Sequence, residues 1–245
     1  MRKYGRGKKS TRSTENWTLS KSRPYGVLYN YLRFTYEKIK VEKKYALSNK
    51  GDVMCFNTGL LDKYDTDIYA IFIKNISEGK KENQDWYLKG FDKSIAPELK
   101  DFSKLSDIVD YFTDAADFIY DRHLKEPVLN FDHIIDDNIQ RFIGIGLNDK
   151  SIILPLLQSA VKKIFEKLKR NYKLAVPQYY LDKKTLQSKI QLLLPLYLRS
   201  NKAELALVVD KEEHKYVGKT VLTLDMAYMN ARRIVRPDSD WLNFT

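Results

Sequence analysis

The densest group of residues that could do chemistry lies in the segment Asn130–Phe142, which reads NFDHIIDDNIQRF. If this segment is helical, Asp132 and Asp136 share one face, while His133 and Asp137 share the next. Paired carboxylates can hold a divalent metal such as Mg²⁺ or Mn²⁺, and a histidine can serve as a general base. We therefore take Asp132, His133 and Asp136 as candidate catalytic residues, and the metal, if one is used, stays unknown.

Two residues later in the same segment could bind a substrate. Asn138 offers an amide, and Arg141 offers a guanidinium that can grip a phosphate with two hydrogen bonds. A purely structural role explains the same letters, with Asn130 or Asp132 as a helix N-cap and Asp–Arg pairs inside a turn. Acids at this spacing are common in helices, so both alternatives stay open.

A second concentration of polar residues lies near the C-terminus, in LTLDMAYMNARRIVRPDSDWL. Asn230, Arg232, Arg236 and Asp240 are the candidates here for contact with a phosphate or a nucleotide. On a helix, Arg232 and Arg236 would be four residues apart and could clamp one phosphate. Arg–Asp pairs that close the end of the domain are an equally good explanation.

The string FNTGL, residues 56–60, offers a third candidate site. Asn57 and Thr58 carry hydrogen-bonding groups beside Gly59, and a glycine permits close approach of a ligand to the backbone. A turn with no ligand fits the same residues equally well.

The formal net charge of +11 favours anionic partners such as RNA, DNA or nucleotides. Residues 1–23 hold eight lysines and arginines against the single acid Glu15, so this segment carries +7 and the rest of the chain +4. A later helical stretch is also rich in lysine and arginine. A solvated tail and the preference of cations for a helix C-terminus are the alternative explanations. The candidate contacts to a nucleic-acid backbone are Arg2, Lys3, Arg6, Lys8, Lys9, Lys163, Lys167 and Arg170.

Several protein classes are disfavoured by what the sequence lacks. Cys55 is the single cysteine, so neither an internal disulfide nor a cysteine-based zinc site is expected, and a reducing cytoplasmic location fits best. No apolar run approaches the roughly 20 residues that span a bilayer, so no membrane association is expected. The basic N-terminus lacks the apolar stretch of a secretory signal. Walker, HExxH, GxSxG and kinase motifs are absent.

The hydrophobic pattern predicts a flexible basic arm, residues 1–24, followed by one α+β domain, residues 25–245. Helical spacing predicts helices from Pro24 to about Val41, over 103–119, over 130–142, and over 149–172 with Pro155 inside. Extended runs predict strands at 52–61, 67–74, 86–91, 175–180, 190–198, 205–210 and 216–224, with KEEHK as a hairpin loop. Asp225 is expected to cap a final helix that continues to Val235. Antiparallel sheets packed by several helices are typical of the α+β class.

The strings FNTGL, DHIIDDNIQRF, AVPQYY, LLLPLYL, ALVVD, GKTVLTLDMAY and RPDSDWL resemble, in this order, the bacterial and fungal family named domain of unknown function 3825. The resemblance runs from about Tyr25 to Leu242 and leaves the arm outside. Because members occur beside LOTUS-type or cold-shock RNA-binding modules, the resemblance implies an RNA setting. It supplies no catalytic residues. It adds weight to Asn57, Asp132, His133, Asp136, Asn138, Arg141, Asp225, Asn230, Arg232 and Asp240.

We therefore expect an RNA- or nucleotide-binding protein, which would be an RNA-processing phosphoesterase if the His–Asp cluster is catalytic. The alternatives are a nucleic-acid-binding module without enzymatic activity and a stress-response interaction scaffold whose arm only aids solubility. Tyrosines on the predicted sheet could stack bases, or could be half-buried strand residues. These tyrosines are Tyr179, Tyr180, Tyr197 and Tyr216.

Overall fold

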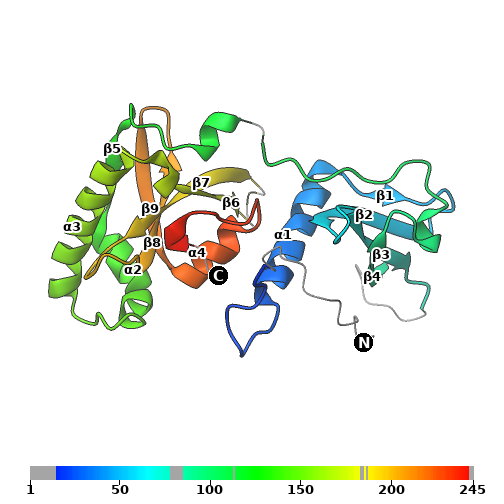
Figure 1. Ribbon diagram of the computed structural model, residues 1–245, viewed down its shortest axis with the longest axis horizontal. Helices are drawn as coiled ribbons and strands as arrows, with labels where there is room; N and C mark the ends of the chain where they lie inside the picture. The colour runs from blue at the N-terminus through cyan, green and yellow to red at the C-terminus, as the bar shows by residue number, and fades with distance from the viewer. Residues whose placement is uncertain (1–14, 78–84, 113, 183–184, 186, 243–245) are drawn as a thin grey trace.

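The computed structural model describes residues 15–77, 85–112, 114–182, 185 and 187–242. It contains two separate sheets, one of four strands and one of five, each with helices packed beside it (Figure 1). Helix α1 and a long connecting segment lie between the sheets. The fold is therefore of the α+β class, as predicted.

The four-stranded sheet comes from the first part of the chain. It follows α1 (Gly26–Glu42) and consists of β1 (Ala46–Leu47), β2 (Val53–Leu61), β3 (Asp67–Lys74) and β4 (Trp86–Lys93). Its strands pair in the order β1-β2-β3-β4, and every pairing is antiparallel. A 3₁₀ turn, η1 (Pro97–Leu99), follows β4. The predicted first helix and the predicted strands at 52–61, 67–74 and 86–91 are confirmed.

The five-stranded sheet is formed by later residues and has the order β5-β9-β8-β7-β6. Its strands are β5 (Lys125–Val128), β6 (Val176–Leu181), β7 (Ser188–Leu196), β8 (Leu205–Lys211) and β9 (Lys215–Thr223). The helices around it are α2 (Phe131–Ile143), α3 (Lys150–Leu168) and α4 (Leu224–Ala231), with the 3₁₀ turns η2 (Ala115–Phe118), η3 (Tyr172–Leu174) and η4 (Asp240–Leu242). In the part of the chain that the structure describes, no helix is long and apolar enough to cross a membrane.

Alternation along β8 shows why helices cover both faces of this sheet. Leu205, Leu207 and Val209 belong to the core beneath α2 and α3, whereas Ala206 and Val208 belong to the core beneath α4. Successive side chains of a strand point to opposite faces, so a strand that is apolar at every position must be covered twice. Figure 1 shows α2 and α3 on one side of the sheet and α4 on the other.

Residues 15–24, which were predicted to be part of the flexible arm, pack against the domain. Arg232 donates from Nη2 to Glu15 Oε2 at 3.0 Å and from Nε to Glu15 Oε1, and both side chains are nearly buried. The Arg232 guanidinium also lies 4.6 Å from the ring centres of Trp17 and Tyr31. The N-terminal segment is thus attached to the end of α4 from Glu15 onward.

The helix predicted over 103–119 is wrong. Residues 103–112 run without regular structure, and only the short turn η2 follows. Leu105 packs against the core of the four-stranded sheet, whereas Val109 and Tyr111 pack with α1 and β6. The apolar residues of this segment serve two cores because the segment connects the two sheets, and one face of a single helix could not reach both.

Three smaller differences concern the ends of elements and one strand. Helix α3 ends at Leu168, before the predicted end at 172. Thr223, not Asp225, caps α4, because its side chain accepts the Met226 N–H at 3.3 Å, and α4 ends at Ala231 rather than Val235. The short strand β5, which pairs in parallel with β9, was not predicted. Four residues carry too little periodicity to indicate a strand.

Candidate nucleic-acid interface

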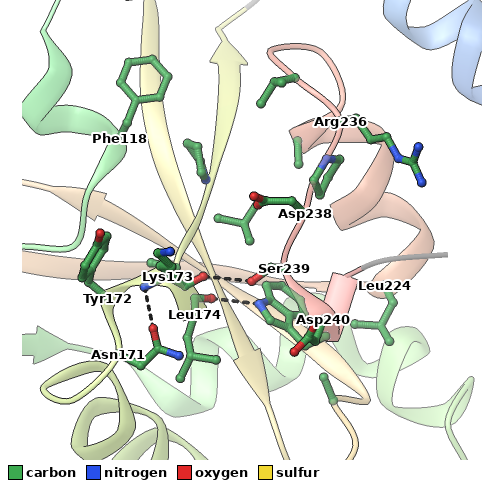
Figure 2. A pocket seen from close by; sticks show the side chains of 18 of the residues that line it. Phe118, Asn171, Tyr172, Lys173, Leu174, Leu224, Arg236, Asp238, Ser239 and Asp240 are labelled. Atoms are coloured by element: carbon green, nitrogen blue, oxygen red, sulfur yellow. Dashed lines mark hydrogen bonds between the residues drawn. The ribbon is translucent and has the colours of Figure 1, made fainter. Parts of the chain in front are cut away.

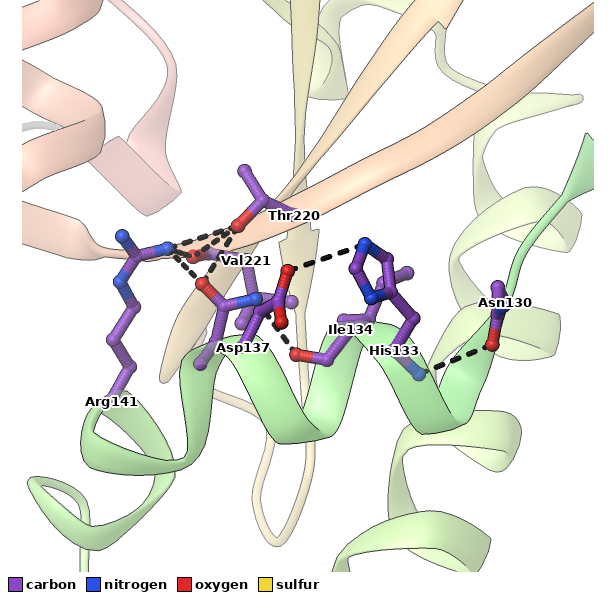
Figure 3. Close-up of polar contacts among 8 residues, drawn as sticks. Asn130, His133, Ile134, Asp137, Arg141, Thr220 and Val221 are labelled. Atoms are coloured by element: carbon purple, nitrogen blue, oxygen red, sulfur yellow. Dashed lines mark hydrogen bonds and ion pairs between the residues drawn. The ribbon is translucent and has the colours of Figure 1, made fainter.

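The candidate catalytic residues Asp132, His133 and Asp136 lie on the exposed side of α2, and Figure 3 shows His133 there beside Asp137. Asn130 caps this helix by accepting the His133 N–H at 3.1 Å. His133 Nε2 lies 3.2 Å from Asp137 Oδ2, and these side chains are 64% and 61% exposed. Pairs this exposed are screened by water and contribute little.

Asp136 forms an equally exposed ion pair with Lys150, the first residue of α3. Residues of α2 line none of four hollows in the described part of the chain. Among the described residues, no group of three His, Cys, Asp or Glu side chains is arranged to hold a metal ion. The predicted acid–histidine cluster is thus a surface feature of α2 without an enclosed site.

The side chains of Asn138 and Arg141 form hydrogen bonds that hold the structure together. Asn138 is buried and interrupts the helical backbone of α2, and its Nδ2 donates to the Ile134 carbonyl at 2.7 Å. Its Oδ1 accepts from Thr220 Oγ1 at 2.8 Å and from Arg141. Arg141 also donates to Thr220 Oγ1 at 3.0 Å and to the Val221 carbonyl, and burial lowers its pKa. Figure 3 shows these contacts joining α2 to β9.

Asn57 and Thr58 lie in β2 of the other sheet, where they are buried and hydrogen-bonded at an irregularity in its pairing with β3. Thr58 Oγ1 donates to the Ile68 carbonyl at 2.6 Å, and Asn57 Oδ1 accepts the Gly59 N–H at 2.9 Å. Gly59 has a φ of +70°, and a Cβ there would lie 2.8 Å from Tyr31 Oη. The group that approaches this backbone closely is therefore Tyr31, whose hydroxyl donates to the Thr58 carbonyl at 2.7 Å.

The four C-terminal candidates are divided among three places. Arg232 is buried against Glu15, and because α4 ends before it, Arg232 and Arg236 do not form a helical pair. Asn230 faces β6, where its Nδ2 donates to Gln178 Oε1 at 3.0 Å. Arg236 and Asp240 line a hollow of about 910 Å³ beside the edge of the five-stranded sheet.

This hollow lies between η3 and the C-terminal segment (Figure 2). The C-terminal segment is fixed to the chain ahead of β6, because Ser239 Oγ donates to the Lys173 carbonyl at 2.9 Å and Trp241 Nε1 donates to the Leu174 carbonyl at 2.9 Å. In Figure 2, Phe118 and Tyr172 lie opposite Asp238 and Asp240. The walls therefore come from segments far apart in the sequence.

Aromatic side chains line this hollow beside cations. Tyr172 is 52% exposed, and Phe118, Tyr197 and Trp241 are partly exposed. Lys167, a predicted backbone contact, places its Nζ 4.0 Å from the centre of the Tyr197 ring. Of the four sheet tyrosines suggested for stacking, Tyr179 and Tyr216 are buried, Tyr197 lines this hollow, and Tyr180 lies elsewhere on the sheet with 40% exposure.

A second hollow of about 490 Å³ adjoins the first, since Ile119 and Tyr172 belong to the walls of both. It brings in Arg170, another predicted backbone contact, whereas Lys163 lies on the exposed side of α3 outside both hollows. We call the two hollows together the basic groove. Its lysines and arginines are Arg122, Lys169, Arg170, Lys173, Lys202, Lys211 and Arg236, and its aspartates are Asp121, Asp238 and Asp240.

Seven cations against three carboxylates give the basic groove a positive field, although some of the cations are paired. Glu166 accepts from Lys169 at 2.7 Å and lies 3.5 Å from Arg170, and these cations hold the pKa of its carboxyl below the usual range. Asp117 lies 3.4 Å from Lys211. Such exposed pairs exchange readily with a polyanion because each contributes little.

Sequence reasoning missed Phe118, Tyr172 and Lys202 as members of a site, whereas Lys173 belongs to the lysine- and arginine-rich helical stretch that was considered as a nucleic-acid face. A usable signal was present for Tyr172, since it interrupts the basic run KLKRNYK, residues 167–173. Aromatic residues interleaved with cations are typical of single-stranded nucleic-acid sites. No local signal indicates Phe118 or Lys202, because only the fold places them beside η3.

Comparison with known protein families gives one match. The model of the domain of unknown function DUF3825 matches residues 9–241. The chain belongs to the DUF3825 family. No curated protein and no solved structure matches it.

The DUF3825 match begins at residue 9, ahead of the start near Tyr25 that the resemblance predicted. It therefore includes Glu15 and Trp17, which pack on Arg232. The predicted arm contacts Arg2, Lys3, Arg6, Lys8 and Lys9 lie outside the residues that the structure describes.

Proposed function

We propose that the protein binds single-stranded RNA along the basic groove. The observation that carries this proposal is the coincidence of exposed aromatic rings and unequal charge in adjoining hollows of about 910 and 490 Å³. Pockets of a few hundred cubic ångströms hold small molecules, so the groove has room for more than one nucleotide.

The chemistry of single strands matches these walls. Bases that are not paired can stack on aromatic side chains, at about 1–3 kcal/mol per base, while cations along the groove neutralise phosphates. Tyr172 offers the most exposed ring where the two hollows meet, and Lys173 and Lys202 lie beside it in the same wall. A duplex would not present its base faces to these rings.

The proposal is restricted to binding. Asp132, His133 and Asp136 are exposed on α2, away from the basic groove, and no described hollow encloses them. RNA is chosen over DNA because the resemblance to the family implies an RNA setting, so a DNA strand of the same sequence belongs in the experiment.

The test is fluorescence anisotropy with a labelled 12-nucleotide RNA at several salt concentrations. Tyr172→Ala should weaken binding roughly 5- to 150-fold, which corresponds to the loss of one stacked base. Lys202→Gln should lower the salt slope by about 0.7, which corresponds to one phosphate contact.

The control is Tyr87→Ala, because Tyr87 in β4 is 52% exposed, like Tyr172, but lies on the other sheet. Equal losses for the two tyrosine variants, or binding that ignores salt, would overturn the proposal. Equal affinity for the DNA strand would remove the choice of RNA.

A further inference from the structure

A third hollow, of about 380 Å³, lies beside α4, on the face of the five-stranded sheet that α4 covers. On this face the side chains of β6 and β7 change from apolar to polar along each strand. Val176 and Leu193 lie in the apolar core under α4, whereas Gln178 and Gln191, two residues away along the same strands, line the hollow. We call this hollow the polar sheet pocket.

A chain of buried amides forms the floor of the polar sheet pocket. Asn230 donates to Gln178 at 3.0 Å, Gln178 Nε2 donates to Gln191 Oε1 at 2.8 Å, and Gln191 Nε2 donates to Asp210 Oδ1 at 2.6 Å. Gln178, Gln191 and Asp210 are each at most 5% exposed. The chain fixes the orientation of every amide because each donates in turn toward the carboxylate.

Two lysines hold the other oxygen of the Asp210 carboxylate. Lys189 Nζ lies 2.5 Å and Lys219 Nζ 3.6 Å from Oδ2, and their side chains are 51% and 41% exposed. The carboxylate is therefore covered on both oxygens, while each ammonium has further N–H groups, and that of Lys219 also lies 4.0 Å from Glu212 Oε1. Asp182 at the rim has its Oδ1 engaged by the Thr185 N–H at 3.2 Å in the β6–β7 turn.

The remaining hydrogen-bonding capacity is mostly that of donors. Beyond the contacts given above, each lysine ammonium has further N–H groups, and Gln178 and Gln191 each have a second amide proton. A ligand for such a pocket must bring several acceptors, as a phosphate does. Tyr180, 40% exposed, lines the same pocket, with Lys189 Nζ 5.8 Å from its ring centre, so a flat ring can stack beside the cations.

We propose that the polar sheet pocket binds the phosphate monoester of a nucleotide, with the phosphate on Lys189 and Lys219 and the base against Tyr180. Asp210 acts as a positioning residue that holds the two lysines. The volume of about 380 Å³ suits one nucleotide and not a strand. This site shares no wall residue with the basic groove, so it stands independently of the proposed RNA binding.

The test is isothermal titration of the full chain with UMP, CMP, AMP, GMP and inorganic phosphate. We expect nucleotide binding that Lys189→Gln and Lys219→Gln each weaken roughly tenfold or more, as the loss of a charge-assisted hydrogen bond does. Lys40→Gln is the matched control, since this α1 side chain is 47% exposed and pairs with Glu37 at 2.7 Å. Thermal melting of each variant confirms that it is folded.

Two further comparisons sharpen the result. A trinucleotide with a 5′-phosphate that binds more tightly than its 5′-hydroxyl form identifies an RNA end as the source of the phosphate, and UMP binding alone identifies free nucleotides. The proposal is overturned if no monophosphate binds at millimolar concentration. It is also overturned if Tyr172→Ala abolishes nucleotide binding while the two lysine variants do not, because the nucleotide would then lie in the basic groove.

Discussion

Replacing Glu15 by glutamine tests whether the N-terminal segment is a structural part of the domain. The Glu15 and Arg232 side chains are 14% and 10% exposed, and the carboxylate accepts two hydrogen bonds from the guanidinium. Removing one partner from a buried ion pair leaves the other charge uncompensated, at about 3–5 kcal/mol. Glutamine keeps one acceptor, so we expect a loss near the lower limit, about 3 kcal/mol.

The assay is urea and thermal unfolding followed by circular dichroism. For a chain of this length each kcal/mol corresponds to about 2–4 °C in Tm, so Glu15→Gln should lower Tm by about 6–12 °C. Glu37→Gln is the control, because Glu37 pairs with Lys40 at 2.7 Å on the surface of α1 and should change stability by less than about 0.5 kcal/mol. Combining Glu15→Gln with Arg232→Met should recover part of the loss, since no buried charge is then left alone.

Equal small losses for Glu15→Gln and Glu37→Gln would refute this reasoning, since the pair would then behave as a solvated one. A double variant that loses more stability than the sum of the two single-variant losses would refute it as well. The two side chains would then be supporting each other through packing alone.

Three other changes have outcomes that the structure specifies. Gly59→Ala should destabilise the protein by about 2 kcal/mol in urea unfolding, because a Cβ at φ +70° meets Tyr31 Oη, and the loss should shrink in a Tyr31→Phe background. Burial raises the pKa of Cys55 to about 11, so dithionitrobenzoate should label the thiol at pH 8 only after unfolding. The stabilisation from the protonated thiol should be present below about pH 8.5 and be lost as the pH rises through 11, and unfolding of Cys55→Ala is the reference. His133→Ala should change the free energy of unfolding in urea by less than about 0.5 kcal/mol, since its pair with Asp137 is exposed; a loss above about 1 kcal/mol would contradict this.

Local patterns predicted most elements of the fold, where one face of one element serves one core. Helix α3, for example, repeats Ile153, Leu157, Val161 and Ile164 toward the five-stranded sheet, and its periodicity is visible in the letters. The segment 103–112 has comparable apolar content, yet its residues divide between two cores, and spacing along the chain cannot reveal that division.

The candidate sites show the same limit more strongly. Polar residues that are neighbours in sequence, such as Asp136 and Asn138, separate into an exposed ion pair and a buried hydrogen-bond network. The polar sheet pocket, in contrast, joins Asn230, Gln178 and Asp210 from three elements. Only Asn230 could be predicted, because the glutamines and Asp210 lie in strands whose register decides which face they occupy.

The attachment of Glu15 to Arg232 has a consequence for biosynthesis. The two residues are 217 positions apart in sequence, so at about 5–20 residues per second the ribosome needs roughly 10–40 seconds to make Arg232 after Glu15. The strands of the four-stranded sheet pair locally and can fold during that interval, and Trp17 can pack on the nearby Tyr31, whereas Glu15 must wait for Arg232. The ion pair between Glu15 and Arg232 is therefore among the last contacts of the described chain to form, so the final position of Glu15 is set only when synthesis has passed α4.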